Sequence, residues 1–154
     1  MCVWPGRLEL ELDERGGRFR LSVQVDRRAR VTLPGGDKQW PQGVQVDGAA
    51  QVVMEEGGAP VVTLEAGQHA LEGRFAWQRL PETLLVPARI ALLELSVGGQ
   101  RLPQPRRDGE RVWLERERGS AEEPESLTLE IFRRLEDQVP FMVHTELVLH
   151  VSGR

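Results

Sequence analysis

The sequence predicts an all-β protein, an antiparallel β-sandwich of about ten strands. Two observations carry this prediction. Apolar residues alternate with polar ones at a period of two along most of the chain, whereas the 3.6-residue period of a helix is hardly found. The 154 residues include 16 Gly and 10 Pro, which is typical of many turns between short strands. A chain of this length can bury a core without metals or disulfides.

The first third of the chain predicts three strands with charged residues between the inward positions. Gly16-Gly17 separates the first strand from the second, and Pro34 ends the third. Alternate side chains of a strand point to opposite faces, so each apolar set would bury one face. The expected inward positions are Leu8, Leu10 and Leu12, then Phe19, Leu21, Val23 and Val25, then Ala29, Val31 and Leu33.

The middle third predicts a hairpin turn at Asp47-Gly48, because this dipeptide tolerates the positive φ angles of a tight turn. Val44 and Val46 would lead into the turn, and Val52 and Met54 would lie on the returning strand. The turn EEGGAP and the short strand VVTL follow. The Ala66-Gly67 turn then opens a strand whose inward face holds His69, Leu71, Gly73, Phe75 and Trp77. We expect Gly73 to leave space for a bulky neighbour or a bulge.

The last third contains the most apolar run, RIALLELSV at 89–97, which predicts a central strand buried on both faces. RVWLERE, LTLEIFRRL and FMVHTELVLHV complete the strands. The acidic segment ERGSAEEPES at 117–126 predicts a mobile loop. The final strand would place His144, Glu146 and His150 outward, and its expected inward residues are Phe141, Val143, Thr145, Leu147, Leu149 and Val151.

An internal repeat is the main question of domain organisation. Gly17-Arg18-Phe19 recurs as Gly73-Arg74-Phe75, each preceded by a leucine eleven residues before the Phe. Two interpretations stay open: a duplication, or a chance alignment of common glycines and prolines. We expect one module over residues 1–154, with duplicated halves at 7–66 and 67–117 and a C-terminal hairpin at 126–152.

The composition of the chain limits the kinds of partner that it can bind. The net charge is -4 and acids and bases are interspersed, so the basic stripe needed for nucleic acid is missing. The single cysteine, Cys2, cannot form an intramolecular disulfide, and we expect it at a frayed terminus. No apolar run is long enough to span a bilayer, so direct membrane insertion is not expected.

Catalytic and metal-binding patterns are weak, and we expect neither an enzyme nor a cofactor. His144 and His150 lie six residues apart on one strand, too far to chelate together, and no paired-histidine motif includes His69. The sequence holds no GxSxG nucleophile turn. An enzyme whose acids converge only in three dimensions is the third alternative, after the two below.

Four tryptophans and no tyrosine favour an aromatic platform for a sugar or a peptide. Trp40, flanked by Lys38 and Gln39 in the loop PGGDKQWPQG, is expected to be the most exposed. Trp77 and Trp113 are expected in the core, and Trp4 at the sandwich edge. The weak binding candidates are therefore Trp40, Lys38 and Gln39, and the alternative function is a carbohydrate-binding module that uses an exposed Trp.

The segments LEAGQHALEGRF, WPQGVQVDG, GRFAWQRLPETLLVP and IFRRLEDQVPFMVHTELVLHVSG resemble parts of β-sandwich modules in large uncharacterised bacterial cell-envelope proteins. The resemblance implies an excised, non-catalytic structural or binding module in the periplasm or envelope, although the chain shows no signal peptide. Its expected partners are flanking domains of the parent protein, another envelope protein or a glycan. The loop from Gly35 to Gln42 would be free to contact them.

Overall fold

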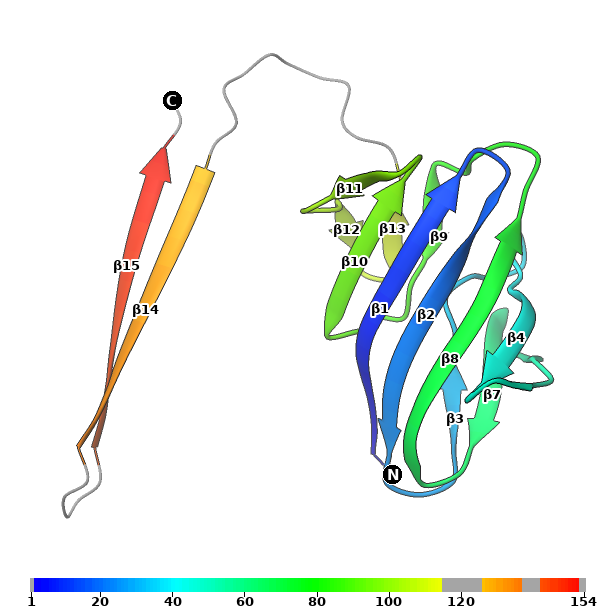
Figure 1. The fold of residues 1–154 in the computed structure, drawn as a ribbon, viewed down its shortest axis with the longest axis horizontal. Coiled ribbons are helices and arrows are strands. Elements are labelled where there is room, and N and C mark those ends of the chain that lie inside the picture. Colours follow the sequence, from blue (N-terminus) through cyan, green and yellow to red (C-terminus); the bar gives the residue numbers. More distant parts are fainter. Residues whose placement is uncertain (1, 115–125, 137–141, 153–154) are drawn as a thin grey trace. The chain divides into compact units, whose positions relative to one another are not determined.

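The computed structural model describes residues 2–114, 126–136 and 142–152, and the chain divides into two compact units, Met1–Glu117 and Arg118–Arg154. The described residues form fifteen strands and no helix, which confirms the all-β prediction (Figure 1). The strands outnumber the ten expected because several contain only two or three residues. One module over residues 1–154 and the duplicated halves stay predictions, and the two units are described separately.

A seven-stranded sheet forms one layer of the first unit (Figure 1). Neighbouring strands of this sheet are antiparallel, with one exception: the first strand of the chain (Val3–Asp13) and the tenth (Leu92–Val97) run parallel. In spatial order the strands are β11 (Gln100–Leu102), β10 (Leu92–Val97), β1 (Val3–Asp13), β2 (Gly16–Val25), β8 (Gly67–Ala76), β4 (Gln42–Val46) and β5 (Ala49–Ala50).

Two three-stranded sheets form the other layer, and they lie behind the large sheet in Figure 1. In spatial order, the first contains β3 (Ala29–Thr32), β7 (Ala59–Leu64) and β6 (Met54–Glu56). The second contains β12 (Arg107–Asp108), β13 (Arg111–Trp113) and β9 (Thr83–Leu85). Antiparallel pairing holds both sheets together.

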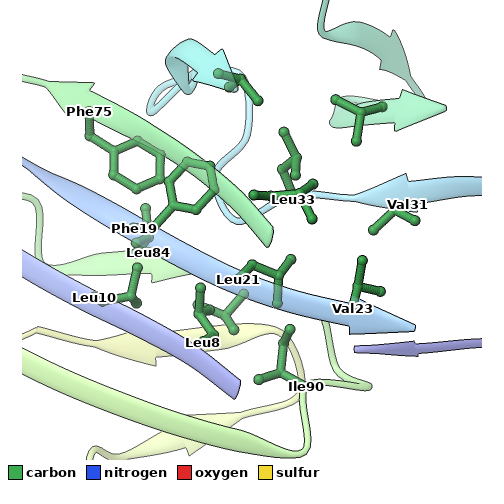
Figure 2. Packing of buried hydrophobic residues seen from close by; sticks show 14 of the residues in the cluster. Leu8, Leu10, Phe19, Leu21, Val23, Val31, Leu33, Phe75, Leu84 and Ile90 are labelled. Carbon is green, nitrogen blue, oxygen red and sulfur yellow. The ribbon is translucent and has the colours of Figure 1, made fainter. Parts of the chain in front are cut away.

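One apolar cluster fills the space between the layers, as in a β-sandwich (Figure 2). Leu8 on β1, Leu21 on β2 and Leu71 on β8 meet Val62 on β7, and each is at most 1% exposed. All ten inward positions expected in the first three strands are buried. Within the described residues, no polar or charged side chain is buried, so the core is purely apolar.

The fourth strand joins the sheet through a β-bulge. Gln42 pairs with Arg74 and Gln45 with Glu72, so two residues of β4 oppose one residue of β8. Gly43 lies in this bulge with a φ of 56°, a left-handed conformation that glycine adopts without steric cost. The bulge lets Val44 remain buried while the strand is kinked beside it.

Three sequence expectations are corrected. Leu92–Val97 is not a central strand buried on both faces: β10 lies next to the edge strand β11, and Leu95 is its one buried residue. The strand after Asp47-Gly48 ends at Ala50, Val52 is exposed, and Met54 pairs in the other layer. Cys2 is held rather than frayed, because its N–H donates to Asp26 Oδ1 at 3.0 Å.

The described part of the second unit is a long hairpin of β14 (Ser126–Glu136) and β15 (Met142–Ser152). The two strands pair antiparallel without a register shift from Ser126↔Ser152 to Glu136↔Met142. The loop predicted at 117–126 falls almost wholly on residues 115–125, outside the described residues, and so does Phe141.

Candidate interaction surfaces

Backbone hydrogen bonds hold the base of the loop that carries the predicted binding residues. The backbones of Gly36 and Gln39 pair in both directions, at 3.2 and 3.0 Å, and the Gly35 N–H donates to the Leu85 carbonyl at 2.8 Å. Gly35 has a φ of 110°, and a Cβ there would collide with the Gln39 carbonyl. The turn is therefore built from backbone contacts that only glycine permits.

Within this loop Lys38 is exposed, whereas Gln39 and Trp40 are half-buried. Trp40 is thus less open than expected. Trp4 instead has 54% of its surface exposed, and it lines a hollow of about 490 Å³ with Pro5 and Arg89. The sequence signal for Trp4 was its outward place between Val3 and Pro5 on β1, which its nearness to the terminus obscured. Sugar or peptide stacking on Trp40 stays a prediction.

The other two tryptophans have packing roles. Trp77 stacks on Phe75 with ring centroids 5.9 Å apart, and its indole Nε1 donates to the Asp13 carbonyl at 2.9 Å. The Arg106 guanidinium lies 4.5 Å from the centroid of the Trp113 ring, a cation–π contact. Both rings are half-buried. Trp77 packs against the core, as predicted. The prediction for Trp113 is wrong, because Val112 is the residue of its strand that enters the core, and the next side chain of a strand points to the opposite face.

His69 forms a polar clamp between β8 and the β4–β5 turn. Its Nδ1 lies 2.7 Å from Oδ2 of Asp47, and its Nε2 lies 3.1 Å from the Glu65 carbonyl oxygen. The Asp47 Oδ1 accepts the Ala70 N–H at 2.9 Å, and the Asp47 N–H donates to the Ala70 carbonyl at 2.8 Å. Asp47 has a φ of 52°, as the predicted turn requires. His69 therefore anchors the turn to the sheet.

Both ring nitrogens of His69 face acceptors, which favours the doubly protonated imidazolium. The hydrogen bond to Asp47 raises the pKa of His69 above its ordinary value of 6.5, and the Glu65 carbonyl adds to this against the opposing effect of burial. The Ala70 N–H, followed by the bond from His69, lowers the pKa of the Asp47 carboxyl below 3.8. Each partner thus favours the charged form of the other.

No group of three or more His, Cys, Asp or Glu side chains among the described residues has a geometry that could hold a metal ion. His69 is saturated by Asp47 and Glu65, and His144 has its Nε2 3.6 Å from Glu136 Oε1 on the hairpin. A separate search of the described residues found no helix with the length and apolarity needed to cross a membrane.

The hairpin of the second unit carries one apolar face. Leu129 pairs with Leu149 and Ile131 with Leu147, and Leu135 pairs with Val143 nearer the end of β14. The Arg133–Thr145 pair interrupts this row once. These six apolar side chains are 48% to 64% exposed. The face that the sequence predicts as inward exists, therefore, and its described side chains are exposed.

The opposite face of the hairpin is mixed in character. Arg134 and Glu136 form an ion pair at 2.9 Å, and Glu146 lies opposite Phe132 in the register. Both faces expose apolar atoms. On the face of Leu129 and Leu147, however, every described pair is apolar except one polar pair. An exposed row of apolar side chains of this kind is typical of an interaction surface.

Comparison with known proteins finds no matching protein-family model and no matching curated protein. Two solved structures are similar over 94% of this chain: a two-domain M1 zinc metallopeptidase variant bound to L-arginine, and the M1 zinc metallopeptidase of Deinococcus radiodurans. Each is 11% identical with a TM-score of 0.41. The chain spans 39% and 38% of their lengths, and a similarity this low carries no conclusion about its activity.

Proposed function

We propose that the chain is a non-catalytic structural or binding module of a larger bacterial envelope protein, and that the apolar face of β14–β15 is its contact surface. The observation that carries this proposal is the row of six exposed apolar side chains on one face of the hairpin. The envelope location rests on the resemblance of the sequence segments quoted above.

Energetics support an occupant for this face. A two-stranded hairpin by itself is marginally stable in water, and it needs a further strand or a packed layer for support. Burial of apolar surface contributes about 25 cal/mol per Å², so covering six side chains that are half exposed offers several kcal/mol. The unpaired outer edges of both strands offer main-chain hydrogen bonds as well.

The occupant that fits is the apolar face of another β-sheet in the parent protein. Leu129, Ile131 and Leu147 project from one side of a pleated ribbon, and two such faces interdigitate at about 10 Å in a sandwich. Arg134 and Glu136, on the other side, would then remain in solvent. The first unit, with its own closed core, acts as a rigid body that carries this element.

Binding of anilinonaphthalene sulfonate, a dye that reports exposed apolar surface, tests the availability of the face in the full 154-residue chain. Leu147→Glu should reduce the dye fluorescence severalfold, because it places a charge in the centre of the row. Phe132→Glu is the matched control, since it makes the same change on the opposite face. Equal fluorescence loss in both variants would count against a face-specific surface.

Hydrogen exchange tests the occupant. In the isolated chain, amides of β14 and β15 should exchange quickly, because a lone hairpin opens readily. In the intact parent protein the same amides should be protected at least tenfold more, on the order of 1.4 kcal/mol. Unchanged exchange in the two settings would reject the proposal.

A further inference from the structure

The two Gly-Arg-Phe tripeptides of the sequence lie side by side in the large sheet. β2 and β8 pair so that Gly17 opposes Phe75, Arg18 opposes Arg74 and Phe19 opposes Gly73. The two arginines therefore face each other across neighbouring strands on the outer face, an arrangement that is destabilising for like charges. A protein gains from such a pair when an anion lies between the guanidinium groups.

The surrounding carboxylates do not neutralise both arginines. Glu11 accepts hydrogen bonds from Arg18, with Nε at 2.7 Å, and Glu72 lies 4.0 Å from Arg20. Among the residues that the structure describes, no carboxylate forms an ion pair with Arg74. Its guanidinium, with five donors in a planar fork, is thus available to a bound oxyanion.

A hollow of about 530 Å³ opens beside these arginines, at the β4 bulge. Arg18, Arg20 and Arg74 line it, against a single acid, Glu72. Gly43 of the bulge forms part of its rim, and the space where a Gly43 side chain would lie is open. The lining is thus positively charged overall, and bulges of this kind are frequent next to binding sites.

Two glutamines complete the lining. Gln42 and Gln45 pair with Arg74 and Glu72 across β4 and β8, and both are exposed. A glutamine amide both donates and accepts hydrogen bonds, which suits hydroxyl groups next to an oxyanion. The hollow therefore combines guanidinium forks for a carboxylate or phosphate with amides for hydroxyls.

A second hollow on the other side of Arg18 and Arg74 has a different balance. Glu11 and Asp13 line it together with the two arginines, so its charges cancel. An anion gains less there than beside Arg20, Gln42 and Gln45, because the two carboxylates repel it. The electrostatics select the hollow at the bulge.

We propose that this hollow binds a small acidic sugar, whose carboxylate or phosphate lies between the guanidinium groups of Arg18 and Arg74. Gln42 and Gln45 hydrogen-bond its hydroxyls, and Glu72 orients Arg20 at the rim. The proposal is independent of the proposed function of the hairpin, because every residue involved belongs to the large sheet of the first unit.

Titration of the ¹⁵N-labelled full chain, followed by NMR, tests this site with three probes. Glucuronate supplies a carboxylate, glucose 6-phosphate a phosphate, and glucose neither. Saturable shifts of the Arg18, Gln42 and Arg74 signals with one or both acidic probes support the site and identify the oxyanion. Two results overturn the proposal. One is a response to glucose equal to that of the acidic probes. The other is no response to any probe up to about 50 mM, a concentration that detects binding free energies of only a few kcal/mol.

Arg74→Gln is the diagnostic variant. It should weaken binding of the acidic probe about tenfold or more, as expected for loss of a charge-assisted pair. Arg30→Gln, on β3 of the other layer, is the matched control, because Arg30 is a strand arginine paired with Glu56 at 2.9 Å. Wild-type affinity in Arg74→Gln, or an equal loss in Arg30→Gln, overturns the proposal.

Thermal unfolding adds a readout that a purely structural role would not give. Without ligand, Arg74→Gln should unfold at the wild-type temperature or above, because it removes a like-charge neighbour of Arg18. With saturating acidic probe, the wild type should gain stability that the variant lacks. A lower unfolding temperature for the ligand-free variant would mean that Arg74 serves the fold, and would overturn the assignment.

Discussion

The Phe19 ring lies over Gly73, in the place where a side chain on Gly73 would be. A Cβ built on Gly73 would lie far inside van der Waals contact with the ring edge and would also crowd Val44. The same ring packs against Phe75 with centroids 5.5 Å apart. The expectation that Gly73 leaves room for a bulky neighbour is therefore confirmed, and the neighbour is Phe19.

Gly73→Ala should destabilise the first unit by about 1–3 kcal/mol, because the added methyl group overpacks a full core. Urea unfolding followed by tryptophan fluorescence measures this. In the background of Phe19→Leu, the cost of Gly73→Ala should fall, since the ring that it meets is gone. Ala76→Ser, exposed on the same strand, is the control and should leave stability within about 0.5 kcal/mol. Additive effects of the two core changes would contradict the contact.

Leucines of the two units should respond differently to truncation. Leu8→Ala should cost about 2–5 kcal/mol, because Leu8 is fully buried and the change leaves a cavity. Leu147→Ala should leave the unfolding of the first unit unchanged, because its side chain is 62% exposed on the hairpin. Urea unfolding of the full chain compares them. A similar destabilisation in both variants would mean that the hairpin face is packed in solution.

The His69–Asp47 clamp should make stability depend on pH at both ends of the range. The raised pKa of His69 gives stability that is fully present below pH 6.5 and is lost as pH rises through the higher folded value. The lowered pKa of Asp47 gives stability that is present above pH 3.8 and is lost as pH falls through the lower folded value. The clamp should therefore contribute most between these two pH values.

His69→Gln tests the clamp by removing the group that titrates at the alkaline end. The unfolding temperature of the variant should no longer decline above pH 6.5. Its decline at acid pH should remain but be smaller, because Asp47 loses the hydrogen bond from His69. Thermal unfolding at half-unit steps from about pH 3 to about pH 9 measures both limbs. An unaltered alkaline limb in the variant would show that His69 is not its source.

Trp77→Phe should destabilise the first unit by about 0.5–1.5 kcal/mol, because it removes the indole hydrogen bond to the Asp13 carbonyl while keeping an aromatic ring on Phe75. Trp4→Phe is the matched control at a site with 54% exposure, and it should change stability by less than about 0.5 kcal/mol. Equal changes in the free energy of unfolding at the two sites would mean that the indole hydrogen bond does not stabilise the fold.

Alternation predicts the first three strands well, down to each buried residue, because one face of each meets the core and the other meets water. The Asp47-Gly48 turn is likewise predicted, since local conformation decides it. The sequence predicts the turn at Asp47 but not its contact with His69. That contact depends on the pairing of β4 with β8, which strand order decides.

The errors arise where long-range packing decides the outcome. The apolar run before Val97 suggests a central strand, yet it pairs parallel to β1 and is flanked by the short β11. Met54 follows the turn at Asp47 but pairs with Val61 in the other layer, because β5 ends after two residues. Arg18 and Arg74 lie opposite each other because of the register between β2 and β8. The repeated tripeptides alone do not reveal that register.

The parallel pairing of β1 with β10 has a consequence for the order of events during synthesis. β1 and β2 leave the ribosome before β10 and can pair at once, because a tight turn joins them. The other edge of β1 must wait for Leu92, the partner of Arg7, before it is closed. Until then the nascent chain presents an open strand edge to its neighbours, which is the period when it most needs protection from aggregation.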